Sequence, residues 1–180
     1  SLHAAYQQSA NHRKNNDSKI RSLSFRADYD LNQNTTIGFM TRGAFKNYEY
    51  APTLQQELNG NKSDIYQVDT ISASAYLENQ TFENWYQKLN LSLYDEYNKD
   101  IYSNFSSTYV GDSANYSADW FHQLELSDEV TFSGGTYLER MQGNDNSFEE
   151  ITANNWSLYS QAEYYPERAP ISLTAGIRHD

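Results

Sequence analysis

The sequence predicts an all-β protein, an antiparallel up-and-down meander that forms part of a large transmembrane β-barrel. Apolar and polar residues alternate along most of the 180-residue chain, the period of a strand with two different faces. The alternating segments are roughly 10 residues long, which suits a tilted strand that crosses a bilayer. The connections between them are short at one end of the sheet and long at the other, as in outer-membrane barrels.

The first three strands are predicted before residue 46. Apolar and polar residues alternate at 2–6 and again at 23–31. In the second of these segments the apolar side chains occupy the odd positions. After the turn-like residues 32–35, a third strand at 37–45 completes a hairpin with the second. One face of this hairpin carries Leu23, Phe25, Ala27, Tyr29, Leu31, Ile37, Phe39, Thr41, Gly43 and Phe45.

Six further strands follow by the same alternation. Each has mainly aliphatic or aromatic residues on one side and charged or hydroxyl residues on the other. Gln87 and His122 break the pattern, because they fall on the apolar side. These strands are predicted at 71–77, 85–93, 118–126, 130–138, 156–164 and 173–177.

The connections orient the predicted sheet. Short turns at the periplasmic end would make the first strand run outward and would place the long loops outside the cell. Tyr29, Trp85 and Tyr164 then lie near the short turns. Phe45, Trp120 and Trp156 lie nearer the long loops, as two interfacial girdles require. Short turns are predicted at 32–35, 79–84, 127–129 and 166–170, and long loops at 11–18, 51–64, 96–113 and 141–154.

Composition excludes several classes of protein. Asp and Glu number 24 against 13 Lys and Arg, a net charge of -11 that argues against nucleic-acid binding. No apolar stretch approaches the roughly 20 residues of a spanning helix. The four histidines are scattered and cysteine is absent, so no metal site and no catalytic constellation is predicted.

The chain is expected to be a piece of a longer protein. It opens in strand-like sequence without an initiator Met or a signal peptide. An odd number of strands with two unpaired edges would leave an open sheet in the membrane. We therefore expect residues 1–180 to be one wall of a larger closed barrel.

The carboxyl-terminal hairpin resembles a hairpin of TonB-dependent outer-membrane receptors. Residues 156–166, WSLYSQAEYYP, and 172–180, SLTAGIRHD, match strands of that family, and TFSGGTYLER at 131–140 is similar to the strand that precedes them. The layout from Tyr66 to Asp180 is similar to the cobalamin and siderophore subgroup. His179 departs from the pattern, which more often has Tyr there.

The resemblance implies a 22-stranded barrel with a separate plug domain, the plug and closing strands lying outside these residues. Such a receptor, not an enzyme, imports an iron-siderophore or a cobalamin-like nutrient across the bacterial outer membrane, and contacts TonB through the missing plug region. Two alternatives stay open: a passive porin or smaller barrel, and a soluble β-rich adhesin or carbohydrate-binding fragment. The glycine pair Gly134-Gly135 suits a bulge or a close approach to the plug.

Two predicted loops contain the candidate ligand-binding residues. Aromatic side chains with carboxylates at a barrel mouth could stack on a flat ligand, or hold Ca²⁺ through oxygen atoms. A merely solvated acidic surface is the alternative. No metal ligand is assigned. The candidates are Tyr97, Tyr102, Phe105, Tyr109 and Phe148, accompanied by Asp100, Asp112, Asp145, Glu149 and Glu150.

Overall fold

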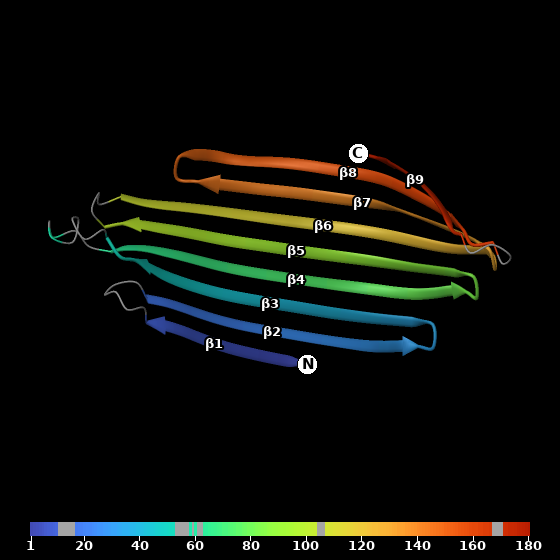
Figure 1. Ribbon diagram of the computed structural model, residues 1–180, viewed down its shortest axis with the longest axis horizontal. Coiled ribbons are helices and arrows are strands. Elements are labelled where there is room, and N and C mark those ends of the chain that lie inside the picture. The colour runs from blue at the N-terminus through green and yellow to red at the C-terminus, as the bar shows by residue number, and fades with distance from the viewer. Residues whose placement is uncertain (11–16, 53–57, 59, 61–62, 104–106, 167–170) are drawn as a thin grey trace.

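The computed structural model is a single sheet of nine antiparallel strands in chain order (Figure 1), which confirms the predicted meander. It describes the chain except residues 11–16, 53–57, 59, 61–62, 104–106 and 167–170. Among the described residues no helix is long and apolar enough to span a membrane. The strands are β1 (Leu2–Ala10), β2 (Asp17–Asn32), β3 (Thr35–Tyr50), β4 (Asp64–Phe82), β5 (Trp85–Tyr102), β6 (Ser107–Ser127), β7 (Val130–Asp145), β8 (Phe148–Tyr164) and β9 (Leu173–His179).

Strand register collects the apolar side chains on one side of the sheet, here called the apolar face. Residues paired across antiparallel strands project to the same side, so one row can be followed from strand to strand. That row is Ala27, Phe39, Ala75, Leu91, Ala118, Leu138 and Trp156. Leu91 is 49% exposed and Trp156 50% exposed, because within the described residues no second layer covers them.

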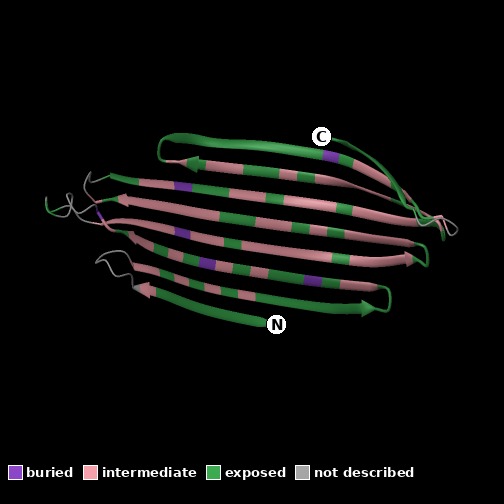
Figure 2. Cartoon of the chain, viewed as in Figure 1, coloured by how far each residue is buried: buried purple, intermediate pink, exposed green. Residues whose placement is uncertain are grey.

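The opposite side, the polar face, contains the most enclosed positions in the described chain. Ala44, Val68 and Ser157 are buried there. Central strands are more enclosed than β1, β9 and the start of β8 (Figure 2). Enclosure therefore comes from neighbouring polar side chains on one face of the sheet and not from an apolar core between two layers.

Two tyrosines on the polar face each connect three strands: the strand that carries the tyrosine, the next strand beneath its ring, and the strand of its hydrogen-bond acceptor. Tyr76 of β4 lies over Gly38 of β3 and donates a hydrogen bond to Asp28 of β2 at 2.5 Å. On the other half of the sheet, Tyr159 of β8 lies over Gly135 of β7 and donates to Asp119 of β6 at 2.9 Å. A glycine is needed beneath each ring, because a Cβ would occupy the space of the phenol.

The glycine pair in β7 therefore has a local explanation. On β7 the pairing with both neighbouring strands is continuous from Thr131 to Gly143, so no bulge forms at Gly134 or Gly135. Tyr159 of this same chain fills the space above Gly135. The prediction of a bulge at this pair is therefore wrong. The group that closely approaches Gly135 is the Tyr159 side chain of the same sheet.

Two of the predicted long loops are also wrong. Residues 96–113 are mostly strand, since β5 runs to Tyr102 and β6 begins at Ser107, and 141–154 contain only the turn at 146–147 between β7 and β8. Both sides of these segments mix polar with aromatic or apolar residues, so the alternation disappears although the backbone still pairs. The β7–β8 turn is as short as the turns at 33–34 and 128–129 at the other end. Of the remaining predicted connections, 11–16 and 167–170 lie outside the described residues.

We expect Gly135→Ala to destabilise the protein by about 1–3 kcal/mol, the usual cost of overpacking. A Cβ at this position would lie 2.5 Å from the Tyr159 hydroxyl and 2.5 Å from the Trp120 carbonyl oxygen. Gly143→Ala on the same strand is the control, because its Cβ would meet only the Asp112 carbonyl oxygen, at 3.7 Å. Guanidinium unfolding of the intact protein in detergent compares the two variants, and equal stabilities would contradict the packing argument.

Candidate ligand-binding rim

The apolar face ends along a line that the register defines. At this line the last apolar residue of one strand pairs with the first charged residue of the next. Phe45 pairs with Asp69, Ile71 with Asp95, and Tyr116 with Arg140. All of these strands continue past the line, towards the β7–β8 turn.

The line crosses the strands obliquely. The line runs from Phe45 on β3 to Leu138 on β7, which takes four steps from strand to neighbouring strand. Over these four steps the end of the apolar face shifts by six residues along the strand direction. With a rise of about 3.4 Å per residue and a strand spacing of about 4.8 Å, the strands are tilted by about 45° from the normal to this line. A flat boundary between apolar and aqueous surroundings would therefore meet the strands at that tilt.

The parts of the strands beyond the line, here called the strand extensions, are polar on the side that continues the apolar face. Asp69, Asp95, Asp112 and Arg140 lie there. On the side that continues the polar face the extensions are rich in aromatic and apolar residues instead. We call this group the aromatic rim. Its members are Tyr48, Tyr50, Tyr66, Tyr94, Tyr102, Tyr109, Met141, Phe148 and Ile151.

The structure brings three of the five candidate residues to the aromatic rim. Tyr102 and Tyr109 project from β5 and β6 on the polar-face side, since Tyr102 pairs with Ser107 and Tyr109 with Asp100. Phe148 follows the β7–β8 turn and pairs with Asp145. Tyr97 lies on the other side of the sheet, between Asp69 and Asp112. Phe105 is outside the described residues.

Four rim tyrosines are not among the residues predicted from the sequence: Tyr48, Tyr50, Tyr66 and Tyr94. Tyr48 and Tyr66 stack with ring centroids 6.2 Å apart, and Tyr50 lies 6.4 Å from Tyr66. Tyr48 and Tyr50 continue the alternation of β3 beyond Phe45, so the spacing Tyr-x-Tyr was a usable signal. The predicted strand ends at Phe45, so these two tyrosines fall outside it.

Carboxylates accompany two of the rim tyrosines, Tyr102 and Tyr109. The Tyr102 hydroxyl donates to Asp100 at 3.4 Å and the Tyr109 hydroxyl to Asp145 at 3.2 Å. The negative charge of Asp100 is the main cause that raises the pKa of Tyr102. Burial, followed by the hydrogen bond to Asp145, raises the pKa of Tyr109. These phenols therefore act as neutral rings and hydroxyl donors, and the charge of the rim resides on the carboxylates.

Several hollows open on the sheet. One of about 290 Å³ is lined by Tyr50, Tyr66, Tyr102 and the carboxylates of Asp64 and Asp100. Another, of about 360 Å³, lies at the β7–β8 tip beside Met141, Phe148 and Ile151. Both lie in the strand extensions, where an aromatic surface is combined with negative charge.

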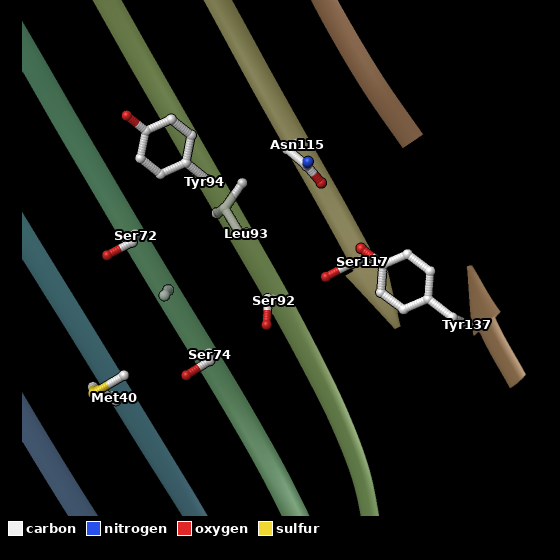
Figure 3. Close-up of a pocket in the computed structure, with 10 residues that line it drawn as sticks. Met40, Ser72, Ser74, Ser92, Leu93, Tyr94, Asn115, Ser117 and Tyr137 are labelled. Atoms are coloured by element: carbon white, nitrogen blue, oxygen red, sulfur yellow. The ribbon is translucent and has the colours of Figure 1, made fainter. Parts of the chain in front are cut away.

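A third hollow lies lower on the polar face. It has a volume of about 350 Å³, and its floor is formed by small hydroxyl side chains from β4, β5 and β6. In Figure 3, Tyr94 and Tyr137 stand on either side of this serine trough. The trough is lined by Ser72, Ser74, Ser92 and Ser117, with Met40 at its margin.

The described part of the rim contains no cluster of metal-binding side chains. Within the described ranges, no three His, Asp or Glu side chains gather closely enough to hold a metal ion. His122 instead packs between aromatic rings, 4.6 Å from Trp120 and 6.0 Å from Trp85. A Ca²⁺ site on the loops stays a prediction.

Comparison of the sequence with protein-family models and with curated proteins gives no match. Comparison of the fold does. In its fold, the sheet is similar to part of the β-barrel of TonB-dependent receptors for ferric siderophores.

Two particular receptors illustrate the likeness. The ferric preacinetobactin receptor BauA of Acinetobacter baumannii has a TM-score of 0.68 and 13% identity, over 89% of this chain and 30% of that one. The open form of the ferric-catecholate import receptor Fiu of Escherichia coli K12 has a TM-score of 0.64 and 10% identity, over 91% of this chain and 35% of Fiu. The chain thus spans about a third of their length. At these identities the likeness concerns the fold.

We expect Tyr94→Phe to raise the pKa of Glu96 towards its ordinary value. The hydroxyl of Tyr94 donates to Glu96 at 2.5 Å and the Asn98 amide at 2.8 Å, and these hydrogen bonds, in that order, lower the pKa of the carboxyl. A lowered pKa means that Glu96 stabilises the fold above its unfolded-state pKa, and that this contribution is lost as the pH falls through its folded-state value.

Carboxyl chemical shifts followed through a pH titration of the intact protein measure this change. Tyr97→Phe on the opposite side of β5 is the matched control, and its Glu96 should titrate as in the parent. An unchanged Glu96 titration in Tyr94→Phe would show that the Tyr94 hydroxyl does not stabilise the carboxylate.

Proposed function

We propose that this chain is part of a TonB-dependent receptor of the bacterial outer membrane, which binds and imports an iron-siderophore or a cobalamin-like nutrient. The observation that carries the proposal is the oblique end of the apolar face. Strands in transmembrane barrels are tilted by about 35–45°, and the line through Phe45, Ile71 and Leu138 requires about 45°. In this arrangement the apolar face contacts lipid.

The aromatic rim then lies outside the membrane, on the inner side of the barrel wall. Tyr102, Tyr109 and Phe148 would contact the ligand before it enters the lumen. Ligand sites combine apolar surface with a few polar groups, and the hollows of about 290 and 360 Å³ have that composition. Both receptors described above are named for ferric chelates, which favours this function over passive diffusion through a porin.

The serine trough lies below the rim and would face the plug domain. Its small side chains, Ser72, Ser74, Ser92 and Ser117, leave room for another polypeptide and offer hydroxyl groups for hydrogen bonds. Energy would reach the receptor through TonB, which contacts the plug region and not this wall. The protein would therefore act as a transporter, without catalytic chemistry and without nucleic-acid partners.

Spin labels on single cysteines along β5 test the membrane orientation, because this chain contains no cysteine. Labels at Leu89, Leu91 and Leu93 should be accessible to oxygen dissolved in lipid. Labels at Asp95 and Tyr97, on the same side of the strand, should be accessible to a water-soluble nickel chelate. The intact protein in lipid vesicles is used, and nickel accessibility at all five positions would overturn the membrane arrangement.

Equilibrium binding of a panel of ferric siderophores and cyanocobalamin to the intact receptor tests the rim. We expect Tyr109→Leu to weaken binding of the cognate compound by about tenfold, the size of one lost aromatic contact. Tyr97→Leu is the control, because Tyr97 lies on the opposite side of the sheet. An equal effect of both substitutions, or no binding of any member of the panel, would contradict the proposal.

A further inference from the structure

Tyrosines and aspartates alternate in a checkerboard at the rim of β3, β4, β5 and β6. Asp64 pairs with Tyr50 in one cross-strand row, and Tyr102 of β5 lines the same hollow as Asp64. In the next row Asp100 lies between Tyr66 and Tyr109. Cross-strand neighbours have Cβ atoms about 4.5–5.5 Å apart, so each carboxylate has an aromatic ring beside it.

The two carboxylates have no cationic partner among the described residues. The three ion pairs formed between described side chains are Arg26–Asp28, Lys88–Glu78 and Arg178–Asp180. Asp64 accepts a hydrogen bond from the Ser103 backbone N–H at 2.9 Å, and Asp100 accepts only the long one from Tyr102. Negative charge is thus held beside aromatic faces without being neutralised by this wall.

The hollow above the checkerboard is small and partly open. It has a volume of about 290 Å³ and is lined by Tyr50, Tyr66, Tyr102, Asp64 and Asp100, together with Ile65 and Ile101. Tyr50 is 55% exposed and Tyr102 39% exposed, so both rings are accessible from the polar-face side. Ligand pockets usually measure about 300–1,000 Å³, so a hollow at the lower end of that range suits a small cationic part of a larger ligand.

We propose that this hollow, here called the Tyr–Asp box, binds an organic ammonium group carried by the transported ligand. Aromatic faces attract organic cations, most strongly when several rings surround the charge. The two carboxylates add direct electrostatic attraction. A bare divalent cation fits less well, because Ca²⁺ requires six to eight oxygen ligands and the box offers two carboxylates among aromatic rings.

The inference deepens the proposed function and rests on it, since it assigns a charge class to the imported compound. An anionic chelate would be repelled by Asp64 and Asp100 at this part of the rim. A compound with a protonated amine or a quaternary ammonium group would be attracted and oriented, with its cationic end towards β3–β5.

Tetramethylammonium is the probe, and 2,2-dimethylpropanol is the neutral compound of similar shape. Saturation-transfer NMR titrations with the intact receptor in detergent measure both affinities. Tetramethylammonium should bind about tenfold more tightly than the alcohol, the size expected for a cation held over aromatic faces. Asp100→Asn should abolish most of this preference, and Asp95→Asn, on the other side of β5, should leave it unchanged.

Tyr66 separates the role of the ring from that of the hydroxyl. Tyr66→Phe should retain binding of tetramethylammonium, because the ring face makes the contact, and Tyr66→Leu should lose it. Both variants must show the parent circular dichroism spectrum and elution volume. Equal binding of the two probes by the parent, or equal loss in Asp100→Asn and Asp95→Asn, would overturn the inference.

Failure of the Tyr–Asp box is distinguishable from failure of the receptor function. Whole-cell uptake of the ferric siderophore panel and of cyanocobalamin is measured in parallel. Uptake that is insensitive to Asp100→Asn would refute the box and leave the receptor function standing. Selective tetramethylammonium binding without uptake of any panel member would support the box and refute the transport of that panel.

Discussion

The structure depends on strand register in a sheet that has only one layer. Within the described residues nothing covers either face, so no second sheet or helix fixes the side chains. Whether a residue reaches apolar or polar surroundings is decided by its pairing with the adjacent strand. A slip by one residue would exchange Leu91 for Asn90 on the apolar face, with the same consequence for every residue of that strand.

The polar face supplies the side-chain contacts that hold this register. Tyr76 and Tyr159 each span three strands and end on an aspartate, and Lys88 pairs with Glu78 on the neighbouring strand at 2.7 Å. Each contact fixes two or three strands relative to each other. From the sequence this face is expected only to contact water. In the structure its side chains make the contacts that fix the register between strands.

The parts of the strands that carry the apolar face were predictable because their two faces differ. Alternation identified all nine strands and placed Phe39, Leu91 and Trp120 on one side. Beyond Asp95 and Arg140 both faces carry polar or aromatic residues, the period of two vanishes, and the same β-structure looks like a loop. Strands that have water on both sides leave no hydrophobic pattern, so the extent of β5 to β8 could not be derived from periodicity.

The same limit explains the mixed result for the candidate site. Composition is sufficient to identify aromatic residues near carboxylates. A loop has no two faces that alternation could distinguish, so the prediction groups Tyr97 with Tyr102 and Tyr109. Once 96–102 is a strand, parity separates them: Tyr97 has the parity of Leu93, and Tyr102 that of Tyr94. Cross-strand neighbours such as Tyr50 and Asp64 are distant in sequence, and only the register of β3 with β4 brings them together.

Tyrosine–aspartate pairs have two roles in this sheet: some connect strands, and others are open to a ligand. The role of each pair depends on the residues around it. Tyr76 and Tyr159 lie flat over glycines and donate short hydrogen bonds to Asp28 and Asp119, which leaves little of either group available to a ligand. At the rim no glycine lies beneath Tyr50 or Tyr66, Tyr66 stacks on Tyr48 with Tyr50 tilted against it, and among the described residues Asp100 receives only a 3.4 Å hydrogen bond from Tyr102. The combination that locks strands together over a glycine is therefore open to a ligand where the glycine is missing.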